Sequence, residues 1–80
     1  VDARIDAAHP MLRNVEVREA HFEDGVPAAT DHATALASVF AARQDHVTLY
    51  SASVFTGTGG DTFGASASSI ALALNWLAES

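Results

Sequence analysis

Residues 45–77 read DHVTLYSASVFTGTGGDTFGASASSIALALNWL, and this stretch decides the fold. Its first part, residues 47–55, is rich in β-branched and aromatic side chains, which predicts a strand. Three of the four residues 57–60 are glycine, which loses too much backbone freedom inside a helix or strand, so the strand ends in a loop. Asp61 suits the N-cap of a helix that continues to Leu77. We therefore predict a strand, a glycine loop and a helix.

The predicted C-terminal helix is apolar on more than one side. A seam at positions i, i+4, i+7, i+11 and i+14 is expected to face a sheet, and it consists of Phe63, Ala67, Ile70, Leu74 and Leu77. The small residues Ser66 and Ala73 beside this seam would let the helix lie close to the sheet. Leu72 and Trp76 form a second apolar ridge, which we predict to be an interface. The chain is therefore expected to form a homo-oligomer, in the simplest case a homodimer.

Upstream of residue 30, the chain divides into a leading segment, residues 1–10, and another predicted strand. Residues 1–10 are expected to be a turn or two of helix, closed before Pro10, or a linker. Residues 12–22 come close to a period-two alternation of apolar and polar side chains, which predicts a strand. Residues 23–27, EDGVP, supply turn residues, so the chain reverses there. We accordingly place a single domain at residues 11–80.

The stretch 30–43 has two interpretations. Ala29, Ala33, Leu36 and Phe40 would line one face of an alanine-rich helix. An internal echo opposes this interpretation, because DHAT and ASVF at residues 31–40 recur as DHVT and ASVF at residues 45–55, where a strand is predicted. By similarity we favour a strand that forms a hairpin with residues 47–55, turning at residues 43–45. The predicted fold is then α+β, an antiparallel three-stranded sheet with the C-terminal helix packed on one face.

Composition and charge exclude several classes of function. The chain has 80 residues, a net charge of −6, four Arg and no Lys, so it has no basic patch for nucleic acid. Its longest apolar run, residues 70–74, is too short to span a bilayer, and we expect no membrane contact. No basic and then apolar leader opens the sequence, which makes the cytoplasm the expected location. Much of the apolar content is Ala, which buries little area, so the domain is expected to have a thin core. The absence of Cys excludes a disulfide framework and a thiolate metal site.

The residue types used in catalysis are present without a convincing arrangement. Asp31-His32 and Asp45-His46 invite a metal or acid–base interpretation, but neighbours on a strand point to opposite faces, so solvated turn residues are favoured. Ser66, Ser68 and Ser69 lie near a helix start, where small hydroxyl residues are ordinary. We therefore predict no catalytic residue, no metal and no cofactor, and a chain that is not an enzyme.

The glycine loop has a better claim to a ligand. Glycine lets a ligand approach the backbone, and the free N–H groups of a helix's first turn favour an anion such as a carboxylate. The predicted ligand-binding residues are Gly57, Gly59, Gly60, Asp61, Ala65 and Ser66. The alternative is a loop that only turns the chain from strand to helix.

The last third of the chain resembles a known family. Gly57-x-Gly59, Asp61, Ala65-Ser66 and then Ala73, Asn75 and Leu77 are similar to the end of the C-terminal regulatory domain of α-isopropylmalate, citramalate and homocitrate synthases. Leu12, Val17 and Arg18 resemble a strand of the same domain, with Val15 where the family has Tyr. The loop after Gly59 is shorter than in the family, and the mid-helix aromatic is absent.

The resemblance implies a β-β-β-α unit, two of which build a dimer that binds an end-product amino acid. On that basis we expect a self-associating regulatory module that takes a small carboxylate effector such as leucine or isoleucine. The alternative, drawn from the apolar ridge, is an assembly subunit that docks on a larger enzyme through Leu72 and Trp76.

Overall fold

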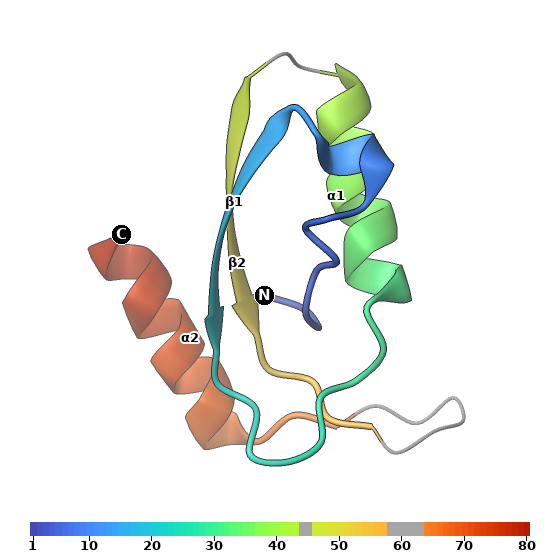
Figure 1. Cartoon of the computed structure of the whole chain (residues 1–80). Coiled ribbons are helices and arrows are strands. Elements are labelled where there is room, and N and C mark those ends of the chain that lie inside the picture. The colour runs from blue at the N-terminus through green and yellow to red at the C-terminus, as the bar shows by residue number, and fades with distance from the viewer. Residues whose placement is uncertain (44–45, 58–63) are drawn as a thin grey trace.

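The described part of the chain folds into two parallel strands with a helix on each side. The structure is a computed structural model that describes residues 1–43, 46–57 and 64–80. In order, the elements are the 3-10 helix η1 (Pro10–Leu12), β1 (Val15–His21), α1 (Asp31–Arg43), β2 (Val47–Ser53) and α2 (Ala67–Glu79) (Figure 1). The α+β class is confirmed. The predicted antiparallel three-stranded sheet is wrong, because the described residues form a two-stranded parallel sheet.

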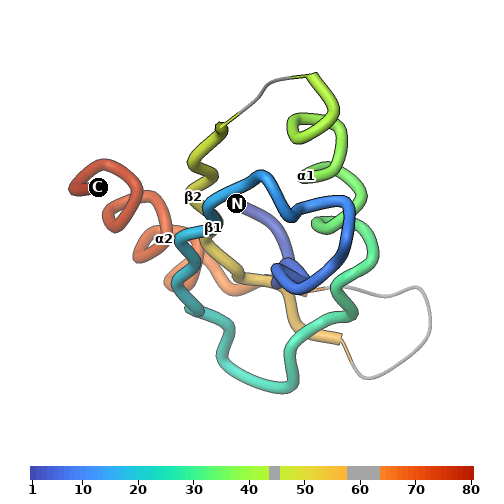
Figure 2. Tube along the Cα trace, turned by 45° about the horizontal axis from the view of Figure 1, so that its top comes forward, coloured from blue at the N-terminus to red at the C-terminus, as the bar shows by residue number. Residues whose placement is uncertain are grey.

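The parallel arrangement follows from the connection between the strands. β1 pairs with β2 in register from Val15 opposite Val47 to His21 opposite Ser53. Parallel neighbours need a long crossover, and α1 supplies it, so β1, α1 and β2 form a βαβ unit. α1 and α2 lie on opposite sides of the strands (Figures 1 and 2). Each face of this small sheet is therefore covered by a different helix.

Residues 30–43 are the main correction to the predicted fold. We favoured a strand and a hairpin turning at residues 43–45, but α1 runs from Asp31 to Arg43. Alanine has the highest helix propensity, and Asp31 in the first turn and Arg43 in the last turn complement the helix dipole. The echo shares polar residues and an ASVF string but not the β-branched content of residues 47–50, so it does not carry strand propensity.

Residues 1–9 contain no helix, and the segment packs against β2. The Asp2 N–H donates to the Ala52 carbonyl at 3.1 Å, and the Asp2 carbonyl accepts from the Val54 N–H at 2.8 Å. These bonds make a parallel bridge between Asp2 and Ser53. Pro10 opens η1 instead of closing a helix, because its missing N–H and fixed φ suit a first helical position.

The C-terminal helix begins later than predicted. Its expected cap, Asp61, and Phe63 lie outside the described residues, and residues 64–66 are not helical. Gly64 instead forms an antiparallel bridge with Thr56, with N···O distances of 2.7 and 3.0 Å. Ser66 is the N-cap of α2, and its hydroxyl accepts from the Ser69 N–H at 3.1 Å. The bridge keeps the chain extended up to this cap.

The buried face of α2 also differs from the predicted seam. Ser69 and Ala73 are buried and Trp76 and Leu77 partly so, whereas Ile70 and Leu74 are 38% and 55% exposed. The predicted seam is therefore wrong for Ala67, Ile70 and Leu74, which are exposed, and right for Leu77, which packs against the core. The small side chains of Ser69 and Ala73 let the helix approach the sheet closely, as expected for Ala73.

The core is thin, as the composition predicts. The hydrophobic residues that are buried are Ala3, Leu12, Ala28, Ala33, Ala37, Ala52, Val54 and Ala73. Only Leu12 and Val54 among them bury more than a methyl group, and each buried methylene contributes only about 0.8 kcal/mol. Polar contacts and any further apolar burial therefore matter more to this chain than to a larger domain.

Candidate functional site

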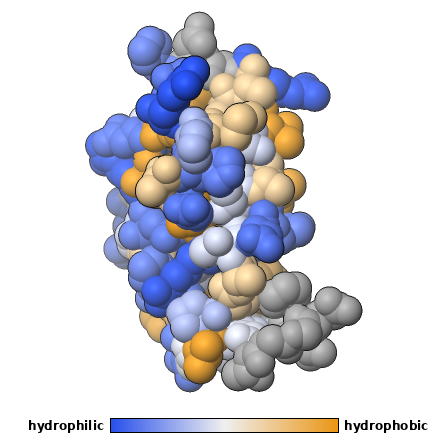
Figure 3. Space-filling model, turned by 45° about the vertical axis from the view of Figure 1, so that its right-hand side comes forward, coloured by the Kyte–Doolittle hydropathy of each residue, from blue (hydrophilic) through white to orange (hydrophobic). Residues whose placement is uncertain are grey.

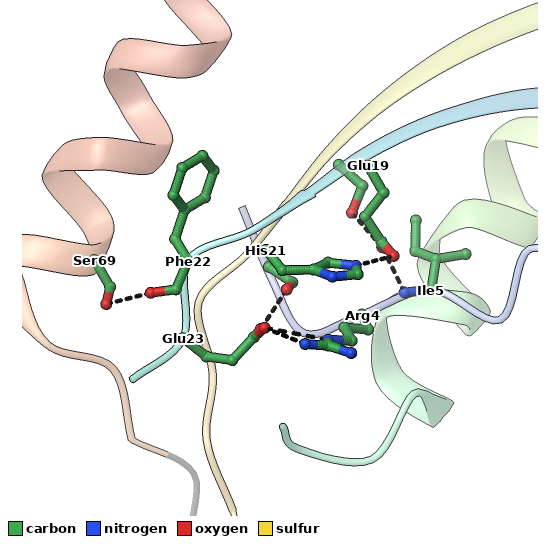
Figure 4. A network of polar contacts seen from close by, with 9 residues as sticks. Arg4, Ile5, Glu19, His21, Phe22, Glu23 and Ser69 are labelled. Carbon is green, nitrogen blue, oxygen red and sulfur yellow. Dashed lines mark hydrogen bonds and ion pairs between the residues drawn. The ribbon is translucent and has the colours of Figure 1, made fainter. Parts of the chain in front are cut away.

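Buried carboxylates gather where β1 ends. Glu23 follows the strand, and its side chain is only 2% exposed. Arg4 donates to its carboxylate from Nη2 at 2.6 Å and from Nε at 3.2 Å, and the Ser53 hydroxyl also donates to it (Figure 4). Glu23 therefore joins the leading segment, the end of β1 and the end of β2.

The pKa of Glu23 depends on two opposing influences, which are its burial and the groups that bind its carboxylate. Burial by itself raises the pKa of a carboxyl group, since it disfavours the charged form. The hydrogen bonds from Arg4 and Ser53 and the positive charge of Arg4 outweigh burial and hold the pKa of Glu23 below its ordinary value. Glu23 is thus a carboxylate at neutral pH, which makes it a poor general acid.

Glu19, which lies within β1, also binds the leading segment. Its Oε2 accepts from the Ile5 N–H at 2.8 Å and lies 3.2 Å from the Ser51 hydroxyl. Its Oε1 lies 2.9 Å from His21 Nε2, on the edge of the cluster (Figure 4). Both carboxylates are satisfied by groups of the chain itself, so this cluster fits a structural role.

A carboxylate of the chain also lies at the start of α2. Asp24 Oδ2 is 3.0 Å from the Ser66 hydroxyl and 3.3 Å from the Ser69 hydroxyl. The Ser69 hydroxyl also donates to the Phe22 carbonyl at 2.6 Å. The carboxylate of Asp24 therefore lies at the helix start, where the helix dipole favours a negative charge, and serine hydroxyls bind it there.

The residues predicted to bind an effector are only partly placed. Gly59, Gly60 and Asp61 lie outside the described residues. The Gly57 N–H donates to the Val26 carbonyl at 3.1 Å, and Ala65 and Ser66 are exposed. The bridge from Thr56 to Gly64 brings the two ends of the predicted loop together.

One histidine contact was missed from the sequence. His32 Nδ1 lies 2.9 Å from Asp2 Oδ2, so its carboxylate partner is 30 residues away and is not the adjacent Asp31. No local spacing signals this pair, because the fold of the leading segment brings it together. His46 is exposed, and Asp45 lies outside the described residues. The described residues contain no group of three side chains suited to a metal ion.

The outward side of α2 carries an apolar surface. Five exposed residues at helical spacing form what we term the α2 stripe, and they are Ala67, Ile70, Ala71, Leu74 and Ala78. Leu72, predicted at an interface, is 57% exposed on the opposite flank of the helix. Trp76, predicted beside it, packs within the chain, with ring centroids 6.2 Å from Phe22 and 6.3 Å from Tyr50.

Within the described ranges, no helix is both long and apolar enough to cross a membrane. The order of elements, βαβα, differs from the β-β-β-α unit implied by the resemblance to the synthase regulatory domain. Comparison of the chain with protein-family models, with curated proteins and with solved structures finds no match.

Proposed function

We propose that this chain is a non-catalytic assembly module that pairs with a second copy of itself through the α2 stripe. The observation that supports the proposal most is the exposure of Ile70 and Leu74, at 38% and 55%, on a helix that covers the sheet with small residues. Contiguous apolar surface of this kind is typical of protein interaction sites.

Charge favours the same surface for self-association. Two copies with a net charge of −6 repel each other, so a dimer interface should avoid charged side chains. α2 has no charged residue before Glu79. The three alanines of the stripe would also let two helices approach closely around Ile70 and Leu74.

The thin core gives association an energetic role. An 80-residue chain buries only about 60% of its unfolded surface, and here most buried apolar residues are Ala. Covering the α2 stripe would bury the remaining surface of one Leu and one Ile side chain per copy, and because these are 55% and 38% exposed, each would contribute about half of the 1.5–3 kcal/mol of full burial. Dimer formation and folding stability are therefore expected to rise together with concentration.

Sedimentation equilibrium over a range of concentrations tests the proposal. Leu74→Glu should weaken the dimer by about tenfold or more, because it removes an apolar contact and places a charge in the interface in both copies. Leu72→Glu is the matched control, since Leu72 is 57% exposed on the same helix but on the other flank. A monomeric wild-type chain, or a dimer lost equally in both variants, would contradict the proposal.

Effector binding at the start of α2 is the second candidate function. The contacts of Asp24 with Ser66 and Ser69 favour it, because a carboxylate of the chain already lies at this position. Leucine, isoleucine or valine would have to displace Asp24, so Asp24→Asn should tighten their binding in calorimetric titration. Absence of heat with all three ligands, for both the wild-type chain and the variant, would exclude this candidate.

A further inference from the structure

β1 forms one edge of the sheet, and this is not the edge that the leading segment approaches. The sheet of the described residues has two strands, so each strand has one outer edge. The leading segment lies at the edge of β2, where Asp2 bridges Ser53. Within the described ranges, no backbone hydrogen bond joins the outer edge of β1 to another segment. The outer edge of β1 can therefore pair with a further strand.

The pairing of β1 with β2 shows which backbone groups of β1 point outward. The Phe22 N–H donates to the Ser53 carbonyl at 2.8 Å, so it points toward β2. Because backbone groups alternate along a strand, those of the even-numbered residues of β1 also point toward β2. The N–H and C=O groups of the odd-numbered residues Val15, Val17 and Glu19 therefore point to the outer edge. The register is continuous over the whole strand, so these groups form a regular row.

Two oppositely charged side chains lie two residues apart on β1. Arg18 Nη2 is 3.2 Å from Glu16 Oε1, and the two side chains are 56% and 59% exposed. Both lie on the α2 side of the sheet, because Arg18 lies 5.8 Å from the ring centre of Tyr50, which packs against Trp76. Charged side chains on an edge strand commonly prevent pairing with another chain. Here the two signs differ, so the edge is complementary to an antiparallel second copy of itself.

We propose that the β1 edges of two copies pair antiparallel around Val17 and join the two sheets into one. Val17 would lie opposite Val17 of the second copy as a hydrogen-bonded pair, and Val15 opposite Glu19. Glu16 would lie opposite Arg18 in a pair without backbone hydrogen bonds, where the Cα atoms approach to about 4.5 Å. Opposite charges in such positions stabilise a sheet. This contact does not use the α2 stripe, so a chain that has both contacts would assemble beyond a dimer.

Charge selects this register over its neighbours. Backbone hydrogen bonding requires that odd-numbered residues of the two strands lie opposite each other. Centring the pair on Glu16, Arg18 or Glu19 meets this requirement but places like charges directly opposite, which destabilises a sheet. Centring it on Val17 instead places opposite charges together twice. Over the α1 side, by contrast, Figure 3 shows polar and apolar residues interspersed, a pattern that does not by itself define a partner.

Sedimentation equilibrium in the Leu74→Glu background measures the β1 contact separately from the α2 stripe. Glu16→Arg and Arg18→Glu should each weaken the remaining self-association by about tenfold or more, because each variant places like charges opposite each other twice per dimer. An equimolar mixture of the two variants should associate again, since residue 16 of each chain then faces the opposite charge at residue 18 of the other. The pair within each strand stays broken in the mixture, so the recovery isolates the contact between copies.

Arg43→Glu is the matched control for Arg18→Glu. It makes the same change in net charge at an exposed residue in the last turn of α1. At physiological ionic strength, where charges more than about 8 Å apart are largely screened, it should weaken association less than about twofold. Mixed with Glu16→Arg, it should restore less association than Arg18→Glu does, because one pair of like charges remains. Circular dichroism checks that each variant is folded.

Amide exchange followed by NMR locates the contact in the backbone. The N–H groups of Val17 and Glu19 should exchange more slowly as the chain associates, and this result together with recovery in the mixture would support the proposal. Four outcomes would overturn it: no association of the Leu74→Glu chain up to about 1 mM, a mixture that associates no better than either variant alone, equal recovery with Arg43→Glu, or unchanged exchange at Val17. The α2 stripe is judged separately, from the difference between the wild type and Leu74→Glu.

Discussion

The two faces of the sheet are held by different kinds of contact. On the α1 face, the carboxylates Glu19 and Glu23 bind Arg4, Ile5 and serine hydroxyls of β2, so directional polar bonds attach the leading segment. The α2 face is instead packed by small and aromatic side chains, with Ala52 and Val54 against α2. The first face depends on partners with fixed geometry, whereas the second depends on how closely the helix can approach.

The substitution with the largest expected effect removes polar contacts on the α1 face. Glu23→Ala removes a buried carboxylate and leaves Arg4 and Ser53 without their acceptor. Losing one partner of a buried ion pair costs about 3–5 kcal/mol, and because Arg4 is 36% exposed we expect about 2–3 kcal/mol from urea unfolding.

The matched control for Glu23→Ala lies on the other face of the sheet. Glu16 also pairs with an arginine, at 3.2 Å from Arg18, but both side chains are more than half exposed. Glu16→Ala should leave the unfolding midpoint close to that of the wild type, because exposed pairs contribute little. Equal losses of stability in the two variants would show that burial does not distinguish the two ion pairs.

The substitution with the second largest expected effect disrupts the packing of α2 on the sheet. Ala73 is completely buried against the sheet, so Ala73→Leu forces α2 away from Ala52 and Val54. Overpacking of this kind costs about 1–3 kcal/mol, which thermal unfolding measures. Ala71→Leu adds the same side chain on the exposed α2 stripe, so it should not lower the unfolding midpoint when both variants are compared at concentrations at which the chain is monomeric. A loss of stability in Ala71→Leu equal to that in Ala73→Leu would contradict the assignment of the buried face.

The sequence predicts the local elements of this comparison better than their arrangement. β1 and β2 lie within the predicted strands at residues 12–22 and 47–55, because their β-branched and alternating side chains signal strands locally. Pairing direction is not a local property. The pairing direction depends on whether residues 30–43 form a strand or a helix. The repeated DHxT and ASVF strings favour a strand there, whereas the helix propensity of alanine decides the structure.

The candidate sites show the same limit. Ser66 and Ser69 were recognised as helix-start residues, but Asp24, which binds them, lies more than 40 residues away along the chain. The choice of Ile70 and Leu74 as core residues followed hydrophobicity, whereas close approach selected Ser69 and Ala73. The clusters around Glu19 and Glu23 had no sequence signal, since each joins segments that only the fold brings together.

The smallest expected effect is on the pH dependence of folding stability, which should differ between substitutions on the α1 face and on the α2 face. The pKa of Glu23 is lower in the folded chain than its ordinary value, so its carboxylate stabilises the fold above the unfolded pKa of about 4.3. This contribution is lost as the pH falls through the folded pKa, and burial, which opposes the lowering, keeps it small. Urea unfolding between pH 7 and pH 3 should therefore show a steeper acidic loss of stability in the wild type than in Glu23→Ala. In Ala73→Leu the acidic loss should match the wild type, since this substitution leaves Glu23, Arg4 and Ser53 in place. An identical pH profile for wild type and Glu23→Ala would mean that Arg4 and Ser53 do not stabilise the charged form.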